Sequence, residues 1–154
     1  MTRPAPLSSH DPANLLAHGP AGPITAGQFF ADVEQLAESL PASRYVLNTC
    51  QDRYLFMVGL GAALLNGRAT LMPSHFTPES LLQLQAHYPD ILCVHDGRQH
   101  PPSLAAWQLD ALPPRHAAPG RLAPSLDPAL VAAIVFTSGT TGEPTAERPA
   151  AFHG

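Results

Sequence analysis

The chain has 154 residues, of which 45% are hydrophobic, and a formal net charge of −4 with neutral histidines. This length allows one domain, the hydrophobic content excludes a disordered chain, and the small negative charge offers no basic surface for nucleic acid or an anionic membrane. All eight basic side chains are arginine, so no ammonium side chain is available for chemistry.

The cysteines and histidines lack the spacing of a metal site. Cys50 and Cys93 are too few for a disulfide framework and lie among apolar residues, so we expect reduced core side chains. The eight histidines show no paired spacing and are expected to be structural or solvent-exposed. No apolar stretch is long enough to cross a bilayer and the first residues do not form a secretory signal, which favours a cytoplasmic protein.

The N-terminal part of the sequence predicts a short hairpin followed by a helix. Residues 1–14 are rich in proline and are expected to form a disordered lead-in, followed by two short strands around a Gly-Pro turn. Thr25 and Gln28 have the spacing of a capping box, and apolar residues then recur at helical intervals up to Pro41. A helix that begins after Thr25 and ends before Pro41 is therefore predicted.

Strands and helices are predicted to alternate through the middle of the chain. Apolar strand patterns are separated by helices that begin at Asp52 and at the Thr77-Pro78 pair, and the first of these helices is apolar nearly all round. Such a helix is normally buried on more than one side. The expected elements are a strand at 44–50, a helix at 53–66, a strand at 69–72, a helix at 78–88 and a strand at 91–95.

A proline-rich connection precedes the last predicted strand. Residues 97–128 contain seven prolines, with a possible edge strand around Trp107, and residues 130–136 form a wholly apolar strand. Because strands alternate with helices, we predict an α/β fold with a mostly parallel sheet and helices on both faces.

One loop carries residues suited to bind phosphate. The last strand leads into Thr137, Ser138, Gly139, Thr140, Thr141 and Gly142, whose hydroxyls and backbone amides can converge on an anion. Loops of this composition are also often simple turns. A Walker loop is excluded because it needs a lysine, and Ser138 is not in a nucleophile elbow. Gly59 and Gly61 are interpreted as sites of close helix packing, since no third glycine completes a dinucleotide fingerprint.

The segment 134–144, Ile-Val-Phe-Thr-Ser-Gly-Thr-Thr-Gly-Glu-Pro, resembles the AMP-binding signature of the adenylate-forming superfamily. These enzymes are acyl- and aryl-CoA synthetases, luciferases and peptide-synthetase adenylation domains. The family signature continues with lysine, where this chain has Thr145. The stretch 44–73 also resembles the AMP-ligases of bacterial aryl-polyene pigment clusters. The resemblance covers residues 15–144 and implies a partial N-terminal AMP-binding domain, whereas the tail 145–154 does not resemble the family.

The resemblance implies an ATP-dependent, Mg²⁺-assisted carboxylic acid–thiol ligase. A carboxylate would attack the α-phosphorus of ATP to give an acyl-adenylate and pyrophosphate, and the thiol of CoA or of a carrier protein would then take the acyl group. The resemblance assigns nucleotide binding to residues 137–142. The adenine-, ribose- and metal-binding segments and a second lysine have no matching positions, so we assign no catalytic residue and expect an inactive N-terminal fragment.

Two other interpretations of the sequence remain open. The chain could be a non-catalytic module that docks on a complementary ligase chain, which would cover its apolar helix and exposed strand edges. It could also be a truncated product without function, because a shift of reading frame after Pro144 would produce the change of pattern at Thr145. A deliberately shortened chain would not explain that change.

Overall fold

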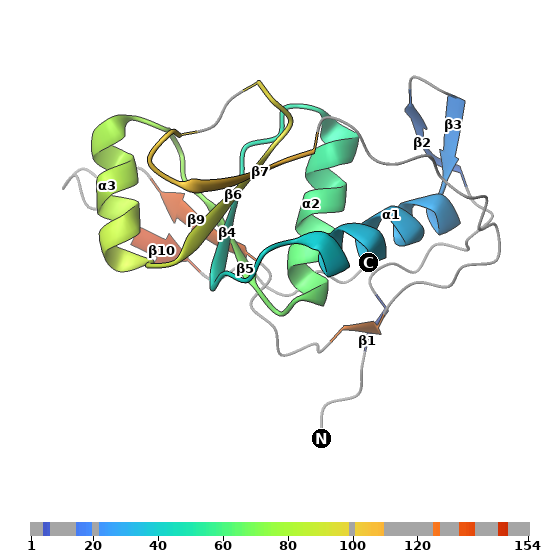
Figure 1. Cartoon of the computed structure of the whole chain (residues 1–154), viewed down its shortest axis with the longest axis horizontal. Coiled ribbons are helices and arrows are strands. Elements are labelled where there is room, and N and C mark those ends of the chain that lie inside the picture. Colours follow the sequence, from blue (N-terminus) through green and yellow to red (C-terminus); the bar gives the residue numbers. More distant parts are fainter. Residues whose placement is uncertain are drawn as a thin grey trace.

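A six-stranded sheet is the centre of the fold, in the order β10-β9-β5-β4-β6-β7 (Figure 1). The computed structural model describes residues 5–6, 15–19, 22–98, 101–109, 125–126, 133–137 and 145–147. The strands of this sheet are β4 (Tyr45–Asn48), β5 (Ala69–Met72), β6 (Ile91–His95), β7 (Ala105–Gln108), β9 (Ala133–Thr137) and β10 (Thr145–Glu147). All neighbouring pairs are parallel except β9 and β10, which confirms the predicted mostly parallel sheet.

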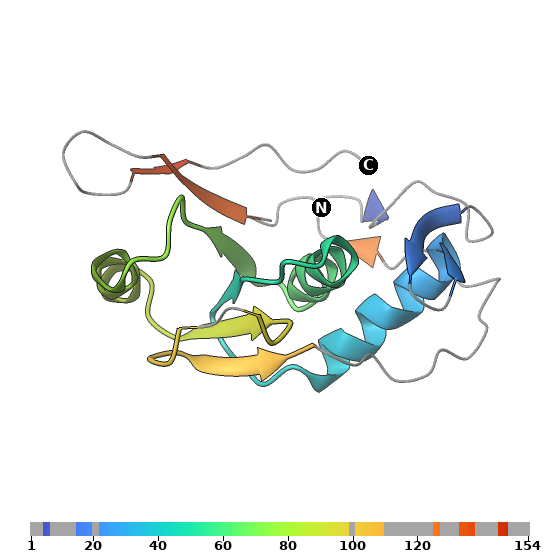
Figure 2. The same cartoon turned by 90° about the horizontal axis from the view of Figure 1, so that it is seen from above.

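Helices cover both faces of this sheet, as predicted. They are α1 (Ala26–Ser39), α2 (Arg53–Leu65) and α3 (Pro78–His87). Helices α1 and α2 lie together on one face and α3 lies on the other (Figure 2). None of the helices in the described part of the chain is long and apolar enough to cross a membrane.

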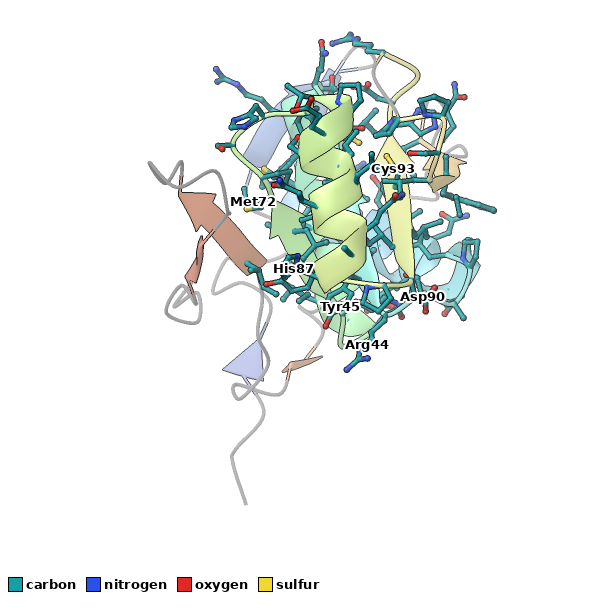
Figure 3. All side chains as sticks on the ribbon, turned by 90° about the vertical axis from the view of Figure 1, so that its left-hand side faces the viewer. Arg44, Tyr45, Met72, His87, Asp90 and Cys93 are labelled. Carbon is teal, nitrogen blue, oxygen red and sulfur yellow. The ribbon has the colours of Figure 1, made fainter. Side chains whose placement is uncertain are left out.

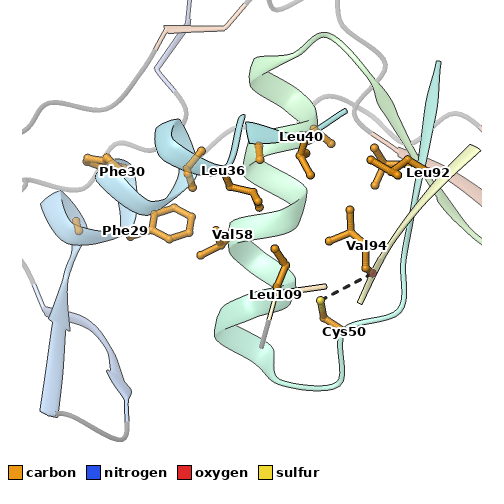
Figure 4. Packing of buried hydrophobic residues seen from close by; sticks show 14 residues of the cluster. Phe29, Phe30, Leu36, Leu40, Cys50, Val58, Leu92, Val94 and Leu109 are labelled. Atoms are coloured by element: carbon orange, nitrogen blue, oxygen red, sulfur yellow. Dashed lines mark hydrogen bonds between the residues drawn. The ribbon is translucent and has the colours of Figure 1, made fainter. Parts of the chain in front are cut away.

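The alternation of side chains along the central strands creates two cores. Val46 on β4 points toward α1 and α2, whereas its neighbour Leu47 points toward α3, because successive residues of a strand face opposite sides. Val94 and Cys93 on β6 divide in the same way. Figure 4 shows the larger core, in which Phe29, Phe30, Leu36, Val58, Leu92 and Val94 pack together.

Each helix begins at the residue that the sequence predicts. Thr25 Oγ1 accepts a hydrogen bond from Gln28 N at 3.2 Å, and Gln28 Oε1 accepts one from Thr25 N at 2.9 Å, which completes the capping box. Asp52 Oδ1 caps α2 through Leu55 N at 2.9 Å, and Thr77 Oγ1 caps α3 through Ser80 N at 3.1 Å. These side chains satisfy backbone donors that the first helical turn leaves unpaired.

Helix α2 is packed on two sides, which agrees with the expectation from its apolar sequence. It contacts α1 on one side and strands β4 and β5 on another, and Val58, Ala62 and Ala63 are fully buried. Its tyrosine, Tyr54, donates a hydrogen bond to the buried carboxylate of Asp32 on α1. Met57 is the exception, since 41% of its surface is exposed.

Three further pairs of strands are present, one of which the sequence predicts and two of which include strands that it does not predict. The expected hairpin is present as β2 (Leu15–Gly19) and β3 (Gly22–Thr25). Within the expected lead-in, β1 (Ala5–Pro6) pairs with β8 (Ser125–Leu126), which lies in the proline-rich connection. In the tail, β10 pairs with β9. Strands β1, β8 and β10 have only two or three residues each, which is too short for a periodic hydrophobic pattern, so the sequence gives no signal for them.

The amino-terminal edge of the sheet is closed by backbone and aromatic contacts near Asp90. Asp90 has φ 65°, and its carbonyl accepts hydrogen bonds from Arg44 N and Tyr45 N at 3.1 Å each. The Tyr45 ring meets the Tyr88 ring edge-on at 5.2 Å between centroids. Figure 3 shows Arg44, Tyr45 and Asp90 together at this end, below α3. The connections that follow the carboxyl ends of the parallel strands lie at the opposite edge of the sheet.

Candidate functional site

The carboxyl ends of β4, β5, β6 and β9 meet at one edge of the sheet. Ligands of parallel α/β sheets bind at this edge, because the connections that follow the strands converge there. The strand order changes direction at β4, because the next strand in the chain, β5, lies on one side of β4 and the strand after it, β6, lies on the other. The loop that the sequence singles out leaves the same edge at the end of β9.

Thr137 is the one residue of the predicted phosphate loop within the described part of the chain. It is the last residue of β9 and lies opposite Thr145 in the antiparallel pair with β10. Ser138, Gly139, Thr140, Thr141 and Gly142 lie outside the described residues. Both ends of the connection 138–144 are thus held by one strand pair, and the family lysine position, here Thr145, lies directly across from Thr137.

Strand β5 lies beside β9 and carries polar residues just past its end. Met72, the last residue of β5, is in register with Val135, and each is 37% exposed. Ser74 and His75 follow on the connection to α3, with Ser74 Oγ 3.0 Å from His75 Nδ1. Both side chains are exposed.

The side chain of Asn48 joins the end of β4 to α2 and to the connection that follows β4. Its Nδ2 donates to the carbonyl oxygen of Phe56 on α2 at 3.0 Å, and its Oδ1 accepts from Cys50 N at 3.1 Å. A Cβ at Gly59 would come 2.8 Å from Asn48 Nδ2 and 3.4 Å from Val94 Cγ1. The structure therefore confirms the interpretation of Gly59 as a site of close helix packing.

Asp96 joins the end of β6 to the start of α2. Its Oδ2 accepts hydrogen bonds from Gln51 N and Asp52 N at 2.9 Å each, and its Oδ1 accepts one from Arg98 N at 3.3 Å. Burial tends to raise the pKa of this carboxyl, but the three backbone donors and the Arg98 charge outweigh burial and hold the pKa below its ordinary value. Asp96 carries no signal in the sequence, because its partners Gln51 and Asp52 lie more than forty residues away.

The arginines of the described part of the chain are divided between the two edges of the sheet. Arg68 donates to the Pro41 carbonyl at 2.8 Å and to Ser43 Oγ at 3.2 Å, on the side where β5 begins. Arg53 and Arg98 follow β4 and β6 and so lie at the carboxyl edge. Arg53 and Arg98 are therefore on connections at the edge where the predicted loop begins, although the chain has no lysine.

Cys50 and Cys93 are buried and free, as expected for reduced core residues. Burial is the largest cause that raises the pKa of Cys50, to about 12, and the nearby Asp96, Cys93 and Asp52 add to it. Burial also raises the pKa of Cys93, against a hydrogen bond from Thr49 that lowers it. Neither thiol is a nucleophile at neutral pH in the folded protein. No group of three His, Cys, Asp or Glu side chains that could hold a metal occurs among the described residues.

No family model matches the sequence, and no curated protein matches it significantly. Solved structures do match the fold. O-succinylbenzoate coenzyme A synthetase (MenE) from Bacillus subtilis, in complex with AMP, is 18% identical with a TM-score of 0.69, over 91% of this chain and 39% of that chain.

Two further solved structures extend the similarity to other acids and acceptors. A malonyl-CoA ligase in a ternary product complex with methylmalonyl-CoA and AMP is 20% identical with a TM-score of 0.59, over 94% of this chain and 31% of that chain. A peptide-synthetase (NRPS) protein containing adenylation and PCP domains is 24% identical with a TM-score of 0.62, over 88% of this chain and 24% of that chain.

The chain has the fold of the adenylate-forming enzymes. This similarity confirms the fold that the resemblance at 134–144 implies, and the chain matches the N-terminal part of these enzymes. It spans about two fifths of the length of the MenE chain and about a third of the malonyl-CoA ligase chain. Within this adenylate-forming fold, the candidate site is the carboxyl edge of the sheet at the end of β9.

Proposed function

We propose that the chain is an N-terminal part of an ATP-dependent carboxylic acid–thiol ligase and that residues 137–142 bind the phosphates of ATP. The observation that carries the proposal is the position of the AMP-binding-like segment, which begins on β9 of a sheet with the adenylate-forming fold. Solved structures with this fold include complexes with AMP and with an acyl-adenylate. We also propose that the protein is cytoplasmic, because ATP and CoA are available there.

The residues available at the loop would orient the phosphates without neutralising their charge. Thr137, Ser138, Thr140 and Thr141 offer hydroxyl groups, and the glycines allow the backbone to approach the oxygens closely. Phosphoryl transfer is accelerated mainly by cations that stabilise the charge developing on the transferred group. Thr145 stands where the family has lysine, and the chain contains no lysine at any position. We therefore propose that the chain alone binds nucleotide weakly and forms no acyl-adenylate.

Nucleotide binding and adenylate formation can be measured separately. We expect isothermal titration of the full chain with Mg²⁺ and ATP to detect binding, and the triple variant Ser138→Ala, Thr140→Ala, Thr141→Ala to lose it. Carboxylate-dependent exchange of labelled pyrophosphate into ATP is expected to be absent. Exchange above background would refute the claim of inactivity, and unchanged ATP binding by the triple variant would refute the loop assignment.

The lysine position offers a gain-of-function test. The variant Thr145→Lys places an ammonium group across the strand pair from Thr137. It is expected to bind ATP about ten- to hundredfold more tightly, since a charge-assisted contact to phosphate is worth about 1.5–3 kcal/mol. Ser103→Lys is the matched control, because it adds the same charge at an exposed residue of the β6–β7 connection. An equal gain in both variants would mean that general electrostatic attraction, and not the loop, binds the nucleotide.

A second candidate function, docking on a complementary ligase chain, is favoured by apolar exposure on one face of the sheet. Met72 and Val135 are register neighbours on adjacent strands, each 37% exposed, and Met57 on α2 is 41% exposed. We expect Met72→Glu to abolish co-purification with a separately produced chain that supplies the remainder of a ligase. Leu82→Glu, at an exposed residue of α3, is the control. Absence of complex formation by the unaltered chain would refute this candidate.

The narrower likeness of residues 44–73 to aryl-polyene AMP-ligases leads us to propose an aromatic carboxylic acid as the substrate of the complete ligase. The acceptor is either CoA or the thiol of a carrier protein. Pyrophosphate exchange by Thr145→Lys in the presence of the complementary chain, with aryl and alkyl acids compared, tests the acid. Preference for alkyl acids would contradict the proposal.

A further inference from the structure

The turn that follows β6 is built around a buried histidine. His95 is 4% exposed, and its ring nitrogen Nδ1 accepts a hydrogen bond from Gly97 N at 3.0 Å. The backbone carbonyl of the same residue accepts from Leu109 N at 2.7 Å, which holds the end of β7. Gly97 has φ 85°, a left-handed conformation that glycine tolerates, and Gln108 lies close beside it.

The hydrogen bond to Gly97 requires one protonation state of His95. A nitrogen that accepts a hydrogen bond carries no proton, so the neutral imidazole here has its proton on Nε2. Protonation would place a hydrogen on Nδ1 that faces the Gly97 N–H, and two donors would then oppose each other. The observed turn is therefore compatible with the neutral ring and not with the imidazolium.

This turn also holds the start of α2. Asp96, between His95 and Gly97, accepts from Gln51 N and Asp52 N at 2.9 Å each. Asp52 is the N-cap residue of α2. A change in the backbone at residues 95–98 would thus move the carboxylate that links β6 to the connection between β4 and α2.

We propose that His95 is a proton-operated latch at the carboxyl edge of the sheet. When its ring is neutral, the turn 95–98 and the start of α2 are held together through Gly97 and Asp96. When the ring gains a proton, the Gly97 bond breaks and the contacts of Asp96 with Gln51 and Asp52 loosen. The contacts that define the latch join described residues, and the proposal does not require that the chain binds ATP.

The charged and titratable groups around the latch act in opposite directions. Carboxylates favour the protonated ring, whereas burial and the arginine oppose it. They come from the turn itself, from the start of α2 and from β6. They are Asp96, Arg98, Asp52 and Cys93.

The experiment follows individual backbone amides of the full chain by ¹⁵N NMR from about pH 7.5 to about pH 5.5. We expect the Gly97, Gln51 and Asp52 amides to shift with one midpoint, equal to that of the His95 ring. Their hydrogen exchange, corrected for intrinsic pH dependence, should become about five- to tenfold faster, as expected for loss of a hydrogen bond. The ¹⁵N shift of the ring should report protonation of Nε2 at the higher pH.

Substitution separates His95 from the other titrating groups. His95→Gln offers a side-chain oxygen to Gly97 but does not titrate, so the coupled shifts of Gln51 and Asp52 should disappear. His87→Gln, at the exposed end of α3, is the matched control and should leave them unchanged. Persistence of the transition in His95→Gln would overturn the proposal. If that variant does not fold, a proton on Nδ1 at the higher pH, or no amide shift with ring titration, in the unaltered chain would overturn it.

Discussion

Asn48 and Gly59 pack so closely that a Cβ on residue 59 would lie 2.8 Å from Nδ2 of Asn48. The same Nδ2 donates to the Phe56 carbonyl on α2, so Asn48 has no room to move away without losing that bond. The contact fixes how near α2 lies to the carboxyl end of β4, where the connections of the candidate site begin.

Gly59→Ala is therefore expected to destabilise the fold, although alanine is the better helix former. We expect the free energy of unfolding, measured with urea, to fall by about 1–3 kcal/mol, the cost of overpacking a tight core. The double variant with Asn48→Ala should lose less than the sum of the two single losses, because removing Asn48 makes room for the methyl group. Stabilisation by Gly59→Ala alone would contradict the close contact.

Thr70 carries a buried hydroxyl that finds no hydrogen-bond partner in the described part of the chain. The residue is fully buried on β5, so its Oγ1 loses hydration on folding without compensation there. We expect Thr70→Val to raise the free energy of unfolding by about 1 kcal/mol. Thr49→Val is the control, because Oγ1 of Thr49 lies 3.6 Å from Cys93 Sγ and the variant should show no such gain. Loss of stability in Thr70→Val would show that the hydroxyl is satisfied.

The lowered pKa of Asp96 predicts a pH dependence of stability. A carboxyl group whose pKa is lower in the folded state stabilises the fold above its unfolded pKa, near 3.9, and loses this contribution as the pH falls through the folded pKa. We expect Asp96→Asn to lower the thermal midpoint at neutral pH, because the amide accepts less strongly from Gln51 N and Asp52 N. As the pH falls below the folded pKa of Asp96, the two proteins should converge.

Thermal unfolding followed by circular dichroism at several pH values tests this prediction. Asp90→Asn is a suitable comparison, because the described contacts of Asp90 are made by its backbone carbonyl and not by its carboxylate. An Asp96→Asn midpoint that stays below that of the unaltered chain by the same amount at every pH would mean that the charge of Asp96 contributes nothing.

Cys50 should be unreactive until the protein unfolds. Burial and the neighbouring carboxylates raise its pKa to about 12, so almost none of it is thiolate near neutral pH. We expect iodoacetamide at about pH 8 to modify neither cysteine of the folded chain within the time that it modifies both in urea. Mass spectrometry of the cysteine peptides reads out each site. Rapid modification of Cys50 in the folded protein would contradict its burial.

Local sequence patterns were sufficient for the three helices and, within a few residues, for the strands β4, β5, β6 and β9. Thr25, Asp52 and Thr77 cap the helices that they predict, since a cap acts within three residues of its own position. The alternation of strands and helices likewise predicted a parallel sheet, because parallel neighbours need a crossover connection. The AMP-binding-like segment at 134–144 pointed to a fold that the comparison with solved structures confirmed.

Features that join distant segments could not be predicted in this way. Nothing near residue 96 indicates that its carboxylate accepts from Gln51 and Asp52, and nothing near His95 indicates that its ring holds Gly97 within a turn against β7. The pairing of β10 with β9 was missed for a different reason, because the hydrophobic pattern of 145–147 carries no strand signal. Each depends on where the folded sheet places its connections.

The sequence by itself determined the order of the elements, their caps, the α/β class and the segment at which nucleotide binding is proposed, because these depend on interactions within a few residues. Only the tertiary structure decided the strand order, the contact of Asn48 with Gly59 and the link from His95 and Asp96 to α2. These contacts form when packing brings together residues that are far apart in the chain, and their energies depend on burial and distances that exist only in the folded protein.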